Sequence, residues 1–112
     1  MITMEDVRSF ALSLPGSTES PHFDMNSFRV NGKIYATVPP TGTHVHIFVS
    51  ENETRAAAAE DGAAFELLFW GKRLAGVRVA LFSADPDRVR ELLHESWRMR
   101  APKNLTSARP TP

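Results

Sequence analysis

Apolar residues recur at the spacing of one helix face near the start of the chain. Thr3 has the position of an N-cap, with Asp6 three residues later, and Pro15-Gly16 ends the pattern. The apolar positions are Met4, Val7, Phe10, Ala11 and Leu14. This spacing predicts a first helix that packs one face against a core.

A second helical pattern lies near the other end of the chain. Ser83 or Asp85 can cap it, Pro86 suits its first turn, and it ends between Arg100 and Pro102. Its apolar stripe consists of Val89, Leu92, Leu93 and Trp97. We expect Trp97 and Trp70 to anchor the core or its edge.

Residues 27–38 alternate as a strand does on both sides of Asn31-Gly32. Asn-Gly favours the positive φ angles of a two-residue type I′ turn, so the segment predicts a β-hairpin. Pairing across the turn places two sets of side chains on opposite faces: Phe28, Val30, Lys33 and Tyr35 on one, and Arg29, Ile34, Ala36 and Val38 on the other. Because the second set is more aliphatic, we expect it to face the core.

Further elements follow the hairpin. Residues 43–49 predict a strand with Val45, Ile47 and Val49 facing inward, and residues 77–82 predict another strand. A capping box begins at Ser50 and predicts a short helix over residues 54–60.

The remaining segments lack clean periodicity. We expect residues 17–26 to form a loop anchored by Phe23, and residues 63–76 to form a short turn of helix followed by a bend. Residues 106–112 are rich in Pro, Ser and Thr and predict a disordered tail. The whole pattern predicts an α+β fold, a two-layer sandwich in which helices pack on one face of an antiparallel sheet, within one domain over residues 1–105.

Composition narrows the classes of function. The 112 residues include no cysteine, which excludes zinc fingers, iron–sulfur proteins and thiol nucleophiles. The start of the chain lacks a basic segment followed by an apolar run, and no stretch approaches 18 apolar residues. We therefore expect a cytoplasmic protein without a cofactor.

The net charge is zero, but its distribution is uneven. Residues 1–70 carry four Lys/Arg against nine carboxylates, and residues 71–112 carry nine Lys/Arg against four carboxylates. The second part of the chain is therefore the expected source of any surface that attracts anions.

Three segments together resemble the MmcQ/YjbR family over roughly residues 3–105. They are Leu14-Pro15-Gly16, the hairpin around Gly32-Lys33-Ile34-Tyr35-Ala36, and residues 88–97 ending in Ser96-Trp97, with Lys103 and Leu105 matching the family's final lysine and leucine. The resemblance implies a frataxin-like (CyaY-like) fold and DNA binding, with hairpins acting as wings. It also raises iron binding, but the first helix offers only Glu5 and Asp6 as oxygen ligands, so we do not expect an iron site.

Phosphate contacts require Lys and Arg gathered on one surface. The candidates are Arg29, Lys33, Lys72, Arg73, Arg78, Arg98, Arg100 and Lys103, with Arg109 in the tail. They predict weak, mostly sequence-independent contacts to double-stranded DNA through the hairpin and the basic second half. The alternative is that these charges only keep the surface soluble.

A second hypothesis concerns the sheet face that we expect to lie outside the core. Phe28, Tyr35 and Phe48 would lie there, where they would stack on bases or form a protein-interaction or homodimer surface. Alternatively, the segment over residues 63–76 covers them. High salt would weaken phosphate binding and leave an apolar dimer intact.

No residue pattern points to catalysis or a metal. His44 and His46 share one side of a predicted strand, with His22 or His94 as a third ligand, but carboxylate partners are missing. Ser20, His22 and Asp24 lie in one predicted loop, and spacing alone does not make a catalytic triad. We therefore expect a binding protein without enzymatic activity.

Overall fold

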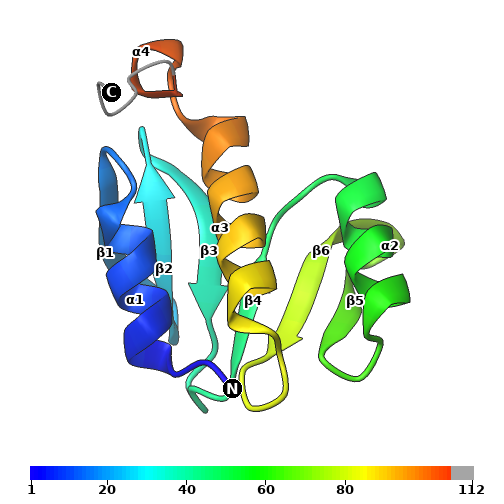
Figure 1. The fold of residues 1–112 in the computed structure, drawn as a ribbon. Coiled ribbons are helices and arrows are strands. Elements are labelled where there is room, and N and C mark those ends of the chain that lie inside the picture. The colour runs from blue at the N-terminus through cyan, green and yellow to red at the C-terminus, as the bar shows by residue number, and fades with distance from the viewer. Residues whose placement is uncertain (107–112) are drawn as a thin grey trace.

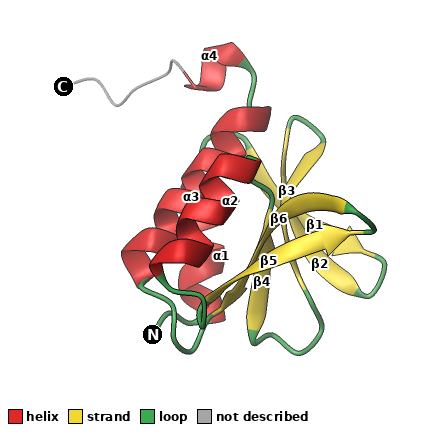
Figure 2. Ribbon diagram, turned by 90° about the vertical axis from the view of Figure 1, so that its right-hand side faces the viewer, coloured by secondary structure: helices red, strands yellow, loops and turns green. Residues whose placement is uncertain are grey.

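The structure is a computed structural model that describes residues 1–106, over which the chain forms four helices and a six-stranded antiparallel sheet. The sheet order is β1-β2-β3-β4-β6-β5. Figure 2 shows the helices stacked on one side of the sheet. This confirms the α+β fold with helices on one face, whereas the kinship to frataxin and CyaY stays a prediction.

The helices that the hydrophobic spacing predicts are present. The four helices are α1 Met4–Ser13, α2 Glu51–Glu60, α3 Pro86–Arg100 and α4 Lys103–Thr106. Thr3 and Asp6 form a reciprocal capping box at α1, and Ser50 Oγ accepts a hydrogen bond from the backbone N–H of Glu53 at α2. Asp85 caps α3. Side-chain acceptors at these positions satisfy backbone donors that a helix start leaves unpaired.

Six strands form the sheet in Figure 1. They are β1 Ser17–His22, β2 Met25–Val30, β3 Lys33–Val38, β4 His44–Ile47, β5 Phe65–Trp70 and β6 Arg73–Ala80. The Asn31-Gly32 turn between β2 and β3 has φ angles of 54° and 75°, as a type I′ turn requires. The hairpin prediction is therefore confirmed.

Two of these strands, β1 and β5, lie in segments that we expected to be irregular. Residues 17–26, expected as a loop, contain β1, and residues 63–76, expected as helix and bend, contain β5 and the start of β6. Both β1 and β5 are edge strands, so each needs hydrogen bonds to one neighbour only. Phe23, the expected anchor of the loop, is 90% exposed at the β1–β2 turn.

The predicted core face of the β2–β3 hairpin is confirmed for Ala36 and Val38 only, because Phe28, Val30 and Tyr35 also lie in the core. Phe28 pairs with Ala36 and Arg29 pairs with Ile34, which leaves Tyr35 as an extra bulged residue. The bulge changes the alternation along β3, so Tyr35 and Ala36 are both buried. The Tyr35 hydroxyl donates to the carbonyl of Ala11 in α1, at 3.2 Å, which fixes its side chain on the helix side.

The exposed aromatic face is also wrong. Phe28, Tyr35 and Phe48 are 1%, 0% and 6% exposed. Phe28 and Tyr35 belong to the core between the sheet and the helices, together with Val45 and Ile47, which face inward as predicted. An interaction surface built from these three aromatic rings is therefore excluded.

The turn that follows α1 contacts the C-terminal part of α3. Trp97 is 4% exposed, as expected, and its Nε1 donates to the carbonyl of Pro15, 2.9 Å away. Ser96 Oγ lies 2.6 Å from the Tyr35 carbonyl and 2.7 Å from the Phe48 carbonyl and donates its single proton to either. The residues that carry the family resemblance at both ends are therefore in contact.

α4 ends at Thr106, which is the first residue of the predicted disordered tail. Residues 107–112, including Arg109, lie outside the described residues. Within residues 1–106, no helix has the length and apolar character needed to cross a membrane.

Candidate nucleic-acid interface and adjoining pocket

Two of the three two-residue hairpin turns lie at the same end of the sheet. Every strand pair is antiparallel, so the β2–β3 turn and the β5–β6 turn lie at one end, and the C-terminus of α3 reaches that end through Ser96. This end, formed by residues 29–33, 71–73 and 97–103, is termed the turn end below. Figure 1 shows the β2–β3 turn and the end of α3 at the top of the molecule.

The turn end is strongly cationic in sequence. Its three segments carry seven Lys/Arg and no Asp/Glu, although the whole chain has zero net charge. The seven are Arg29, Lys33, Lys72, Arg73, Arg98, Arg100 and Lys103. Topology therefore brings together most of the cations that the sequence proposed as phosphate contacts.

The individual side chains differ in their exposure and in their hydrogen bonds. Lys33 and Lys72 are exposed at the two turns, and Lys103 is exposed at the start of α4. Arg29 is half-buried, and its Nε donates to Ser27 Oγ at 3.1 Å. Arg100 Nη1 donates to the Phe48 carbonyl at 2.8 Å, and burial lowers the pKa of Arg100 below its ordinary value.

Two of the proposed cations are held by carboxylates. Arg78 lies in the middle of β6, away from the turn end, with its Nη1 3.1 Å from Glu66. Arg98 is paired with Glu95 one turn earlier in α3, and this hydrogen bond lowers the pKa of Glu95. Both arginines are weaker candidates than the lysines at the turns.

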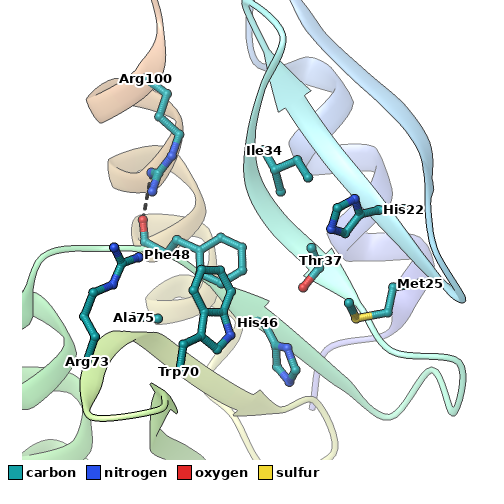
Figure 3. A pocket seen from close by; sticks show the side chains of 10 residues that line it. All are labelled: His22, Met25, Ile34, Thr37, His46, Phe48, Trp70, Arg73, Ala75 and Arg100. Carbon is teal, nitrogen blue, oxygen red and sulfur yellow. Dashed lines mark hydrogen bonds between the residues drawn. The ribbon is translucent and has the colours of Figure 1, made fainter.

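A pocket of about 280 Å³ opens on the helix-free face of the sheet beside the turn end. Figure 3 shows Phe48, Trp70 and Arg73 on one side of it, with Ile34 and Thr37 opposite. Its lining consists of His22, Met25, Ile34, Thr37, His46, Phe48, Trp70, Arg73, Ala75 and Arg100.

Polar atoms without partners mark the pocket. Thr37 and His46 pair across β3 and β4, and within residues 1–106 Thr37 Oγ1 and His46 Nε2 are buried without a hydrogen-bond partner. An unpaired buried polar group costs about 1–3 kcal/mol. Burial, and then the nearby charges of Arg78 and His44, lower the pKa of His46 below its ordinary value, which favours the neutral imidazole.

The aromatic wall of the pocket was not predicted. Trp70, expected to anchor the core or its edge, is 53% exposed, and its ring centroid lies 5.0 Å from that of Phe48. The Arg73 guanidinium lies 5.5 Å from the Trp70 ring. The sequence feature that could have indicated this wall is an aromatic residue directly before a Gly-Lys-Arg turn.

The histidines do not gather into a metal cluster. Among residues 1–106, no three His, Cys, Asp or Glu side chains lie where they would hold an ion. His44 Nδ1 bonds Thr43 Oγ1 at 2.9 Å, and His94 packs on Trp97. His22 shares the pocket with His46, but carboxylates are absent from its lining.

Comparisons with known proteins place the chain in a family. The chain is similar to a crystal structure of the Deinococcus radiodurans protein DR2400, with its DUF419 domain, at a TM-score of 0.79 and 22% identity. The match covers 96% of this chain and 84% of that one, and it supports the fold. No curated protein sequence matches the chain. A sequence model described as YjbR matches residues 12–99, so the chain belongs to the YjbR family.

Proposed function

We propose that this protein binds nucleic acid through the turn end, in a role without catalysis. The observation that carries the proposal is the gathering of seven Lys/Arg, with no Asp/Glu, in the three segments that form this end. Each lysine or arginine that neutralises a phosphate releases condensed counterions, and this release favours binding. The exposed lysines at the two hairpin turns would make the first contacts, in the manner of paired wings.

Binding of this kind is weak and nearly independent of base sequence. The cations occupy turns and the end of a helix, and the described side chains do not form the Asn/Gln/Arg array of a helix that reads the major groove. The zero net charge of the chain also removes any long-range attraction. We expect a Kd in the usual non-specific range of about 10⁻⁴–10⁻⁶ M at physiological salt.

The test is fluorescence anisotropy of a labelled DNA duplex of about 25 base pairs, titrated at several salt concentrations with the wild type and Lys33→Glu/Lys72→Glu. Each lost phosphate contact removes about 0.9 from the slope of log K against log salt. The double variant is therefore expected to bind less tightly and to show a slope smaller by about 1.8.

The matched control is Arg55→Glu/Arg90→Glu, which changes the net charge equally on the helix layer. Arg55 on α2 and Arg90 on α3 lie outside the three segments of the turn end and are paired with Glu51 and Asp87. This control is expected to keep most of the wild-type affinity. Equal losses in both variants would show that only net charge matters, and the turn end would then have no special role.

A further inference from the structure

We propose that the pocket on the helix-free face binds a nucleotide unit, meaning a heteroaromatic base carried together with a phosphate. The inference deepens the proposed function and rests on it in one respect, because a strand held at the turn end would bring such units to the pocket. Arg73 and Arg100 belong to both surfaces, so the two sites are continuous.

The charges around the pocket favour an anionic ligand. Arg73 and Arg100 line it, and none of its ten lining residues is Asp or Glu. Within residues 1–106, Arg73 lies against the Trp70 ring and forms no ion pair with a carboxylate. A phosphate at this rim would therefore meet a guanidinium with its charge uncompensated, in the fork geometry that suits phosphate oxygens.

The aromatic wall favours a flat ring. Trp70 keeps about half of its surface exposed although it lines a pocket, and the ring of Phe48, the residue after β4, packs against it. Aromatic side chains beside cations are the usual arrangement for stacking bases next to their phosphates. The volume of about 280 Å³ lies at the lower limit of small-molecule sites, which suits one ring and its substituent.

Thr37 and His46, which form the polar floor of the pocket, favour a nucleobase over a simple aromatic acid as the ligand. Thr37 Oγ1 and His46 Nε2 lie on adjacent strands, on one face, and neither has a hydrogen-bond partner among the described residues. A hydroxyl and a neutral imidazole can each donate or accept a hydrogen bond. They therefore suit a ring edge that carries both donors and acceptors, as the edges of bases do, whereas an unsubstituted ring would leave both atoms unpaired.

The experiment is an NMR titration of the full chain that follows the Trp70 indole N–H and the His46 imidazole. The probes are adenosine monophosphate, uridine monophosphate, ribose 5-phosphate and a ten-nucleotide single strand. Thr37→Val and Ala75→Phe test the pocket, the first by removing an unpartnered hydroxyl at constant shape and the second by filling the space. Thermal unfolding and the duplex titration confirm that each variant is folded and that its turn end is intact.

We expect at least one nucleotide or the strand to shift both reporter signals, and ribose 5-phosphate to leave the His46 signal unchanged. Thr37→Val should weaken that binding about tenfold, and Ala75→Phe should abolish it. Binding of the strand alone would identify a base within nucleic acid as the ligand, and binding of the monophosphates alone would identify a free nucleotide.

Unaltered affinity in both variants, or equal shifts with the base-free sugar phosphate, would overturn the inference. If these results came with salt-dependent duplex binding, the proposed function would still stand. Loss of duplex binding with retained nucleotide binding would instead remove the proposed function and leave the pocket as a site for free nucleotides.

Discussion

Replacing Trp97 with alanine is expected to lower the free energy of unfolding by about 3–5 kcal/mol, the range for truncating a large buried aromatic side chain. The ring is 4% exposed and belongs to the core formed by α1, α3 and the sheet. Its Nε1 also donates to the Pro15 carbonyl, so truncation leaves that acceptor unpaired. The contact joins α3 to the turn after α1, more than 80 residues earlier in the chain.

Urea denaturation followed by circular dichroism measures this loss. His94→Ala is the matched control, because the His94 ring contacts Trp97 from the exposed side of the same helix. It should change the stability by less than about 0.5 kcal/mol, as surface substitutions usually do. A loss below about 1 kcal/mol for Trp97→Ala would contradict the burial described here.

Substituting Gly76 with alanine is the second change with a large expected effect. A Cβ at this position would lie 2.3 Å from the Ile47 carbonyl oxygen and 3.0 Å from the Phe48 Cα. Both are backbone atoms at the end of β4, so no side chain can turn away to make room. We expect a destabilisation at or above the upper end of the range of about 1–3 kcal/mol for overpacked cores.

The same denaturation experiment tests Gly76→Ala, with Gly62→Ala as its control. A Cβ on Gly62 would lie 3.4 Å from the Ala58 carbonyl oxygen, which is an ordinary contact distance. The control should therefore retain stability close to that of the wild type. Similar stability in the two variants would mean that β4 and β6 do not approach each other this closely.

The helices were predictable because their information is local. Thr3, Ser50 and Asp85 cap helices through hydrogen bonds that span two or three residues, and the stripe containing Val89 and Trp97 repeats at helical spacing. The Asn31-Gly32 turn depends on two adjacent residues in the same way. In each case, residues close in sequence determine the helix or turn, and the rest of the chain contributes only burial.

The errors arise where distant residues decide the structure. The bulge at Tyr35 changes which side chains of the hairpin face the helices, and the hydroxyl contact with α1 that favours this arrangement joins residues 24 apart. The edge strand β5 contains large apolar residues on both faces, so alternation could not reveal it. The hydrogen bonds of β5 to β6 hold this segment as a strand although its sequence does not alternate.

The candidate site was predictable in residue type but not in arrangement. Lys33 and Lys72 were proposed as phosphate contacts from their charge, and the antiparallel topology brings their turns to one end. The pocket was not predicted, because its wall and floor combine Trp70, Thr37 and His46 from three different strands. Only the sheet order places these residues on a common face.

The most direct test of the central claim is an amide NMR titration of the isotope-labelled protein with a short DNA duplex at low salt. If the turn end binds nucleic acid, the amides of Gly32, Lys33, Gly71 and Lys72 should shift together with those near Arg100, and added salt should reverse the shifts. The amides at the opposite end, such as that of Asp24 in the β1–β2 turn, should stay in place. Shifts centred on that opposite end, or none at low salt, would contradict the account.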